Sequence, residues 1–376
     1  MSDSKYKVEF TLKQHTPIIH FQSGQPGATL RATELKPKLD KYLLKYVEGI
    51  PYRKNTNGHR YLDYKVKITN DTSVEVEMEE RPPLYFANTG KSEDEKMKQK
   101  FGENNYPVVN FFSFDEKVKN AIKDHFEAFL ANTNFGTRQS KGFGSFYLVN
   151  ETSKKPFPFN QELIHGTVYS FPSTVSRWDK DIGLLYAFLR QGINLPNKQG
   201  TRFYTKPAIF LYAKEKMGWE WDKKVIKAYF FSDILQDQQG KYSADSAVNY
   251  SSDKQYLLRD LFGLSSTQKW GRPYDTTINK EHNEIERFQS PITFKFVEGR
   301  VYFWSNGTEK EILDQNFTVI VKGKKMTLRT PSEFDFNAFF EFVKTIDLSK
   351  VVEPRFQSQQ KYRDLTRMLK SIKASK

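Results

Sequence analysis

The sequence predicts an α+β fold built from two modules, and three observations support this prediction. The chain has 376 residues, enough for two or three domains of about 100–200 residues each. Segments with a hydrophobic period of two, typical of strands, are interspersed with segments of period three to four, typical of helices. A hairpin, a strand and a helix recur in the second half, and they indicate a second α+β unit.

The first predicted strand covers residues 6–14, where hydrophobic and charged residues alternate. A helix is expected next, because hydrophobic residues recur every four positions from Leu35 to Val47. We expect this helix to begin near Lys36, since Pro37 is tolerated in the first turn of a helix but not in its interior.

The rest of the first half repeats these two kinds of pattern. Its elements are a hairpin at 64–69 and 73–79 with a turn at Asn70-Asp71, an apolar run at 107–114 that can add a strand, a helix capped by Asp115, and a strand at 145–149. The resulting order, βαββαβ, is that of a ferredoxin-like fold, which is also the topology of the RNA recognition motif. We therefore expect a ferredoxin-like domain at residues 1–150.

The second half shows weaker patterns of the same kinds. They predict strands at 165–171, 208–213 and 317–321, a hairpin at 291–296 and 300–304, and helices at 182–189, 225–235, 256–264 and 334–346. We interpret residues 151–376 as a second ferredoxin-like module with helical insertions. Residues 355–376 are rich in Lys and Arg and have one apolar face, which predicts a basic amphipathic helix or a tail that becomes ordered on binding.

Composition limits the classes of function. The mean hydropathy is −0.70 and no run of about 18 apolar residues exists, so neither a membrane span nor a membrane partner is expected. The N-terminal residues do not have the pattern of a secretory signal. Cysteine is absent, which excludes disulfides, thiolate zinc sites and cysteine nucleophiles and suits a reducing compartment, the cytoplasm. The net charge of +14 favours a polyanionic partner, most often nucleic acid, although an acidic protein also fits.

The basic, glycine-punctuated loop at residues 134–144 is the most informative local feature. Glycine reaches positive φ and lets the backbone approach a ligand closely. Three glycines together with Arg138 and Lys141 suit contact with a phosphate backbone. The order of residues is neither that of a P-loop nor that of a dinucleotide-binding loop. An ordinary helix-to-strand connection with a glycine cap remains the alternative.

This loop also carries a family resemblance. Residues 135–145 (FGTRQSKGFGS) resemble the glycine-rich loop of the RAMP superfamily of CRISPR-associated proteins. Residues 16–21 (TPIIHF) and 28–39 (ATLRATELKPKL) are similar to that family's first strand, loop and first helix, although the small-Gly-small step of many relatives is missing. The two-domain arrangement, with Arg287–Pro291, resembles the two-domain subunits of type III (Cmr- or Csm-like) effector complexes.

The resemblance implies a subunit of a type III antiviral effector complex that binds CRISPR RNA, with target RNA and other RAMP subunits as further partners. No H-E-x-x-H motif and no paired histidines with carboxylates occur in the sequence, so neither a metal nor another cofactor is expected. The RNA-binding residues carried over by the resemblance are Arg31, Lys36, Lys38, Gly136, Arg138, Lys141, Gly142 and Gly144. Phe135 and Phe143 are candidates for base stacking, but packing that anchors the loop is the favoured interpretation of both.

Two alternatives remain open. Some relatives are metal-independent endoribonucleases that process precursor CRISPR RNA with a histidine, and His15 and His20 are the candidates here. An ordinary loop histidine is the favoured interpretation of each, and the lack of a compelling catalytic set favours a non-catalytic subunit. The other alternative is a protein-interaction module whose basic surfaces meet acidic partners.

Overall fold

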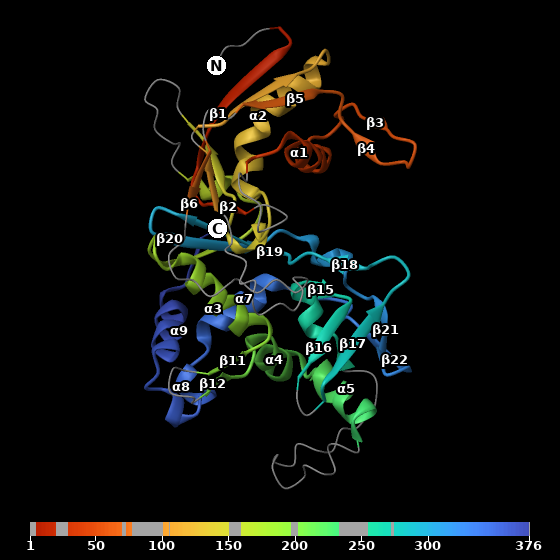
Figure 1. The fold of residues 1–376 in the computed structure, drawn as a ribbon, viewed down its shortest axis with the longest axis vertical. Helices are drawn as coiled ribbons and strands as arrows, with labels where there is room; N and C mark the ends of the chain where they lie inside the picture. Colours follow the sequence, from red (N-terminus) through yellow and green to blue (C-terminus); the bar gives the residue numbers. More distant parts are fainter. Residues whose placement is uncertain are drawn as a thin grey trace. The chain divides into compact units, whose positions relative to one another are not determined.

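In a computed structural model the chain forms two compact units (Figure 1). Unit 1 consists of residues 1–168 and 293–302 with the C-terminal residues 375–376, and unit 2 consists of residues 169–292 and 303–374. The structure describes residues 5–19, 29–69, 73–76, 101–104, 106–149, 159–196, 202–232, 255–271 and 274–375. The predicted α+β class is confirmed by the mixture of helices and strands in both units.

A four-stranded antiparallel sheet forms the centre of unit 1. Its strand order is β5-β8-β1-β9. These strands are β1 (Lys7–Gln14), β5 (Lys65–Thr69), β8 (Val108–Phe112) and β9 (Phe146–Leu148). The smaller strands of the unit are β2 (Ile18–Ile19), β3 (Arg53–Lys54), β4 (Arg60–Tyr61), β6 (Ser73–Val76) and β7 (Phe101–Asn104).

The hairpin predicted from β5 and β6 is wrong in its pairing. Both strands form, but β5 pairs with β8 and β6 pairs with β7 in a different sheet. Alternation of hydrophobic residues predicts a strand and its buried face, but it does not specify the partner strand.

Two helices cover one face of the central sheet. They are α1 (Ala32–Tyr46) and α2 (Glu116–Asn132). The carboxylate of Asp115 accepts hydrogen bonds from the backbone N–H groups of Lys117 and Val118, so the predicted cap of α2 is confirmed. Helix α1 begins at Ala32, four residues earlier than predicted, and Pro37 therefore lies inside it.

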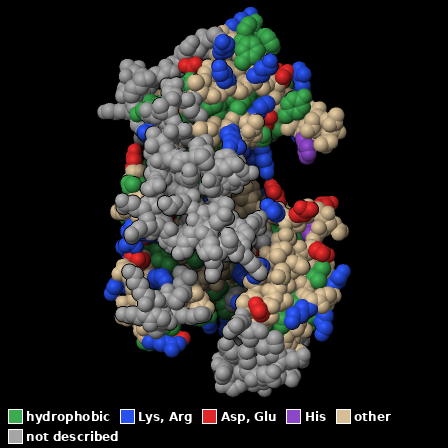
Figure 2. Space-filling model, in the orientation of Figure 1, with side chains coloured by type: hydrophobic (Ala, Val, Ile, Leu, Met, Phe, Trp, Pro, Cys, Tyr) green, Lys and Arg blue, Asp and Glu red, His purple; other side chains and the backbone are tan. Residues whose placement is uncertain are grey.

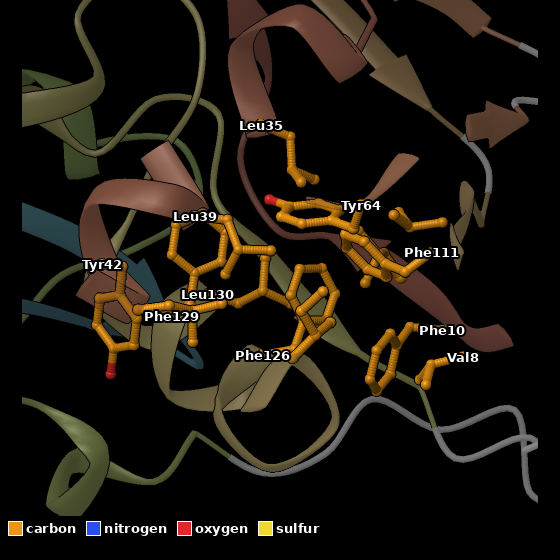
Figure 3. Packing of buried hydrophobic residues seen from close by; sticks show 14 of the residues in the cluster. Val8, Phe10, Leu35, Leu39, Tyr42, Tyr64, Phe111, Phe126, Phe129 and Leu130 are labelled. Carbon is orange, nitrogen blue, oxygen red and sulfur yellow. The ribbon is translucent and has the colours of Figure 1, made fainter. Parts of the chain in front are cut away.

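The core of unit 1 is formed by the inner face of the sheet and the facing sides of α1 and α2 (Figure 3). The rings of Phe10 and Phe126 lie 4.6 Å apart, which joins β1 to α2. The labelled core residues in Figure 3 are Val8, Phe10, Leu35, Leu39, Tyr42, Tyr64, Phe111, Phe126, Phe129 and Leu130. The loop that follows α2 is consequently attached to a rigid helix.

Unit 2 contains a six-stranded sheet with the order β13-β14-β22-β21-β17-β16. These strands are β13 (Glu220–Trp221), β14 (Gln255–Tyr256), β16 (Thr267–Trp270), β17 (Thr276–Glu281), β21 (Asn316–Val321) and β22 (Lys324–Arg329). Two further strand pairs are β11 (Ile193–Pro196) with β12 (Arg202–Thr205), and β15 (Leu264–Ser265) with β18 (Arg287–Phe288). Of the remaining strands, β10 (Val168–Pro172) and β23 (Lys373–Ser375) lie mostly in unit 2, β19 (Ile292–Val297) lies almost entirely in unit 1, and β20 (Arg300–Ser305) is divided between the two units.

The helices of unit 2 are α3 (Trp178–Arg190), α4 (Ala208–Tyr212), α5 (Asp222–Phe230), α7 (Phe336–Thr345), α8 (Leu348–Val351) and α9 (Gln360–Ser371). Two predictions in this unit are wrong. Residues 208–213, predicted as a strand, form α4 and the start of a π-helical turn. Residues 256–264, predicted as a helix, contain a 3₁₀ turn between two short strands. Short apolar runs do not distinguish a buried helix from a buried strand.

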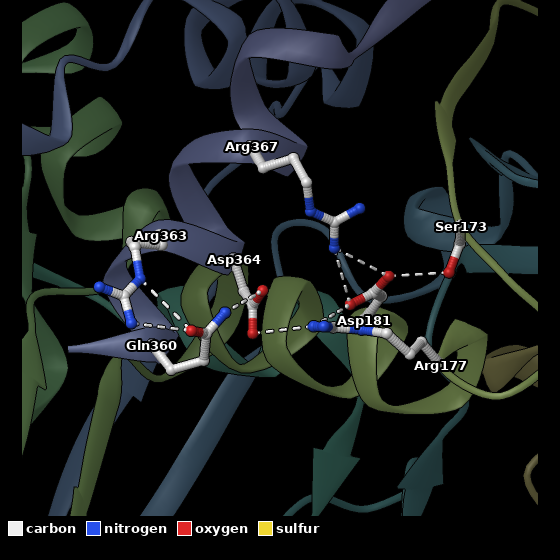
Figure 4. Close-up of polar contacts among 7 residues, drawn as sticks. All are labelled: Ser173, Arg177, Asp181, Gln360, Arg363, Asp364 and Arg367. Carbon is white, nitrogen blue, oxygen red and sulfur yellow. Dashed lines mark hydrogen bonds and ion pairs between the residues drawn. The ribbon is translucent and has the colours of Figure 1, made fainter.

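The predicted basic helix at the C-terminus is confirmed as α9, which packs against α3 (Figure 4). The buried carboxylate of Asp181 on α3 lies 3.2 Å from the guanidinium of Arg367 on α9. Ser173 donates a 2.7 Å hydrogen bond to the same carboxylate, and Arg177 forms a 2.8 Å ion pair with Asp364. At least part of the basic charge of this helix therefore stabilises unit 2 itself.

Candidate functional site

The glycine-rich loop connects α2 to β9 and has a compact shape. Gly136, Gly142 and Gly144 all have positive φ, and so does Arg138. A Cβ atom on Gly144 would lie 1.8 Å from the carbonyl oxygen of Phe135, and one on Gly136 would lie 2.6 Å from that of Ile19. These two glycines are thus required by the conformation of the loop itself, whatever the loop binds.

Many backbone N–H groups of the loop are already hydrogen-bonded within unit 1. The N–H of Thr137 donates to the carbonyl of Ile19, and the N–H of Gly144 donates to that of Pro17, both at 2.9 Å. Further donors of this kind are the N–H groups of Phe135, Gly136, Lys141, Gly142 and Ser145. A phosphate cannot use these groups, so contact with a polyanion would come mainly from side chains at the tip of the loop.

Lys38 and Glu34 attach the loop to α1. The ammonium of Lys38 lies 2.6 Å from the carboxylate of Glu34 and donates to the carbonyl of Asn134 at 2.9 Å. The same carboxylate accepts the N–H of Gly136 at 2.8 Å. Burial lowers the pKa of Lys38, while the neighbouring Glu34 opposes this shift. In this structure Lys38 therefore holds the loop against α1.

Lys36 has a different environment. Its ammonium donates to the carbonyl of Leu62 at 2.8 Å, forms a 3.2 Å ion pair with Asp40, and lies 3.7 Å from the ring centre of Tyr64. Lys36 and Lys38, both predicted from the sequence to bind RNA, therefore make different contacts in the structure. Arg31 is exposed at the residue that precedes α1.

Both aromatic residues of the loop are buried. The ring of Phe135 packs edge-on against Phe129 and Phe146, with centres 6.0 and 5.9 Å apart, and Phe143 is buried to the same extent. The packing interpretation is confirmed for both residues, since a buried ring cannot stack on a base. The cations of the loop are Arg138 and Lys141, and both residues are half-buried. Nε of Arg138 and Nζ of Lys141 are themselves shielded from solvent, and the ammonium of Lys141 lies 5.8 Å from the ring centre of Phe294.

Lys295 is a site residue that the sequence analysis missed. It comes from β19 and its side chain is completely buried. Its ammonium donates to the carbonyl of Thr133 at 3.1 Å, to Oδ1 of Asn134 at 2.8 Å and to Oγ of Ser145 at 2.9 Å. Burial lowers the pKa of Lys295 well below its usual range. In the sequence this lysine lies between Phe294 and Phe296, and the structure shows that every residue of the strand is buried.

His15 lies beside this lysine. Its ring centre is 4.3 Å from that of Tyr147, and Lys295 lies 4.9 Å from the Tyr147 ring centre. Burial, with the charges of Lys295 and Lys13, lowers the pKa of His15 to about 4. The structure thus brings a histidine, a tyrosine and a lysine together, but Tyr147 and Lys295 are buried and cannot reach a phosphodiester. His20, the other histidine candidate, lies outside the described residues.

Neither a cluster of metal ligands nor a membrane-spanning helix is found in the described part of the chain. Among the residues that the structure describes, no group of three or more His, Asp or Glu side chains is arranged to hold a metal ion. Within the same residues, no helix has both the length and the apolar character needed to cross a membrane.

Comparison with protein families gives the assignment. The model of the Cmr1 N-terminal domain matches residues 5–193, about half of the chain, and that of the Cmr1 C-terminal domain matches residues 204–370. The chain belongs to the Cmr1 family. It is a RAMP-like subunit of the type III CRISPR effector complex of the Cmr kind, which confirms the resemblance found in the sequence.

Comparisons with single proteins add little to this assignment. Among solved structures, the chain is similar to the apo-form crystal structure of Cmr1 from Pyrococcus furiosus, with 10% identity over 98% of each chain and a TM-score of 0.36. A score this low carries no argument about shared details. No curated protein matches the chain significantly.

Proposed function

We propose that this Cmr1-family subunit binds guide and target RNA as a non-catalytic part of its effector complex, through cations displayed around the glycine-rich loop. The observation that carries the proposal is the anchoring of the loop. Lys38 holds it from α1 and Lys295 holds it from β19, and this fixes the position of Arg138 and Lys141 at the tip. A preorganised pair of cations loses little conformational entropy when it meets a phosphate backbone.

The residues expected to bind RNA divide into two groups under this proposal. Arg31, which is exposed, and the guanidinium of Arg138 contact phosphates directly, whereas Lys141, whose ammonium nitrogen is buried, contributes its charge at longer range. The others act through the shape of the loop or of α1, and they are Lys36, Lys38, Gly136, Gly142 and Gly144. The support for this division is that Lys36 donates to the carbonyl of Leu62 and Lys38 to that of Asn134, so both lysines join α1 to neighbouring segments of unit 1.

We also propose that residues 1–150 form a ferredoxin-like domain. The order of β1, α1, β5, β8, α2 and β9 in the chain, with the strand order β5-β8-β1-β9 in the sheet, supports this interpretation. Residues 151–376 are proposed as the second domain of the same kind, enlarged by insertions. Its partners are other Cmr subunits, and the lack of cysteine supports the cytoplasm as its location.

A binding experiment tests the proposal. Labelled CRISPR-repeat RNA is incubated with the pure chain in EDTA and resolved on native and denaturing gels. We expect a shifted but intact RNA. The variant Arg138→Ala/Lys141→Ala should lose affinity, and its log–log salt slope should fall by about 0.7 for each phosphate contact removed.

The matched control is Lys214→Ala/Lys324→Ala, which removes two exposed lysines of unit 2. It removes the same charge, so equal losses in both variants would mean that only net charge matters. Unchanged RNA affinity in the loop variant, with circular dichroism intact, would contradict the proposal. Cleavage of the RNA in EDTA would contradict its non-catalytic part.

A further inference from the structure

The aromatic rings of Tyr6, Phe112 and Phe114 meet at the surface of unit 1. Phe114 is 79% exposed and Tyr6 is 37% exposed, although both are large apolar side chains. The ring centre of Phe114 lies 5.5 Å from that of Tyr6 and 4.9 Å from that of Phe112. Single exposed hydrophobic residues are common, but a cluster of exposed rings marks an interaction site more often.

Lysines on the two neighbouring strands flank the ring of Phe112. Lys7 of β1 and Lys65 of β5 lie directly opposite Phe112 of β8, one on each side. Directly opposed residues share one face of a sheet, so the three side chains form a row across its outer face. The inner face, represented by Val8 and Phe111, is buried in the core.

The next row across the same face of the sheet is polar. It contains Glu9 of β1, Asn110 of β8 and Lys67 of β5. Glu9 is the one carboxylate among the six residues of these two rows. The ammonium of Lys5 lies 5.3 Å from the ring centre of Tyr6. In Figure 2, exposed hydrophobic side chains lie beside Lys and Arg side chains at the top of the view, over this end of unit 1.

We propose that this aromatic face, defined as Tyr6, Lys7, Lys65, Lys67, Phe112 and Phe114, binds a single-stranded segment of RNA. Unpaired bases stack on the rings of Phe114 and Tyr6, while the lysines on both sides of Phe112 neutralise the adjoining phosphates. The inference rests on the proposed function, since it assumes an RNA partner. It adds a second contact region, on different elements from the glycine-rich loop.

The chemistry of the aromatic face favours single-stranded RNA over the other ligands. Stacking needs bases whose flat surfaces are free, and a duplex hides them. An acidic protein would satisfy the lysines but would leave the exposed rings unused. A purely apolar protein surface would cover the rings and desolvate the lysines without a counter-charge, which is unfavourable. A nucleic acid strand offers apolar base faces and negative phosphates at alternating positions.

Fluorescence anisotropy with a labelled oligouridine of about 15 nucleotides tests the aromatic face in the full chain. Phe114→Ala should weaken binding roughly 5- to 100-fold, the loss expected for one stacked base. Its melting temperature should not change, because the side chain is exposed. Lys7→Gln/Lys65→Gln/Lys67→Gln should lower the salt slope by about 2. A duplex of the same length should compete poorly.

Tyr204→Ala is the matched control, since it removes a 43% exposed aromatic side chain from unit 2. Unchanged oligouridine affinity in both Phe114→Ala and the triple-lysine variant would contradict RNA binding by the aromatic face. If Arg138→Ala/Lys141→Ala alone loses affinity, the proposed function holds and the inference about the aromatic face is wrong. Failure of the unaltered chain to bind any RNA overturns both. Loss of co-purifying subunits, with RNA affinity unchanged in Phe114→Ala, would make the face a protein interface and would also overturn the inference.

Discussion

The ammonium of Lys295 lies 2.8 Å from Oδ1 of Asn134 in the interior of unit 1, although 161 positions separate the two residues in the chain. Asn134 is the first residue of the glycine-rich loop, and its own amide donates to the carbonyls of Gln139 and Phe294. The base of the loop is therefore joined to β19 by hydrogen bonds in both directions. These contacts support the base of the loop from two elements, as the RNA contact proposed above requires.

Replacement of Lys295 should weaken unit 1 strongly. Lys295→Met keeps most of the side-chain volume but leaves three buried acceptors without this donor, and we expect a loss of about 3 kcal/mol. The midpoint of urea unfolding measures it. Lys350→Met changes an exposed lysine and should stay within about 0.5 kcal/mol. Equal midpoints for the two variants would show that the buried lysine contributes nothing.

His15 should make the stability of unit 1 depend on pH. Its pKa is about 4 in the folded chain and near 6.5 when unfolded, so between these values the unfolded state binds more protons. The free energy of unfolding should fall as the pH drops from 6.5 to 4, by up to about 3 kcal/mol. His15→Gln should lack this part of the pH dependence, whereas His59→Gln, at an exposed position, should keep it.

Thermal or urea unfolding at several pH values measures the difference between His15→Gln and the unaltered chain. Other titrating groups act equally in both proteins and cancel. A difference that stays constant from pH 7 to pH 4 would contradict the lowered pKa of His15.

Two glycine substitutions should have opposite effects. Gly144→Ala places a Cβ atom against the carbonyl of Phe135 at a positive φ, and we expect a loss of about 3 kcal/mol or more with a distorted loop. Gly183→Ala lies on the exposed side of α3 with open space around it, and should stabilise unit 2 by up to about 1 kcal/mol. The shift of each melting temperature gives the sign. Destabilisation by both would mean that lost backbone freedom is not the deciding factor at Gly183.

The buried carboxylate between α3 and α9 should matter more than either of its arginine partners. Asp181→Ala removes the acceptor of Ser173 and Arg367 and leaves Arg177 with Asp364, with an expected cost of about 3 kcal/mol. Arg367→Ala should cost about 1 kcal/mol or less, because that side chain is largely exposed and Arg177 remains. Equal losses in urea unfolding would indicate that the pair acts as one unit.

The local patterns of the sequence predicted the elements of unit 1 well. The alternation in β1 and the cap at Asp115 are properties of neighbouring residues, and both are found as expected. The start of helix α1 was predicted four residues too late, because proline was expected in the first turn of the helix and not in its interior. Burial of Leu35 and Leu39 against the sheet offsets the backbone hydrogen bond that Pro37 cannot form. Rules based on neighbouring residues do not include this tertiary burial.

The candidate site was predicted only as far as its loop. The glycines and the order of basic residues identified the loop, and the pairing of Glu34 with Lys38 one helical turn away is also a local pattern. The contacts of the loop residue Asn134 are not local, because it lies 96 positions from Lys38 and 161 positions from Lys295. Contacts of that range depend on the tertiary fold.

The return of residues 293–302 to unit 1 has a consequence for synthesis on the ribosome. Residues 1–168 are made first, yet the strand that carries Lys295 follows only after about 120 further residues. At roughly 5–20 residues per second, this gap lasts about 6–25 s. During that time the nascent chain can form the sheet and its two helices, but the base of the glycine-rich loop has not yet met its buried lysine. The loop therefore matures late, when most of unit 2 has already been translated.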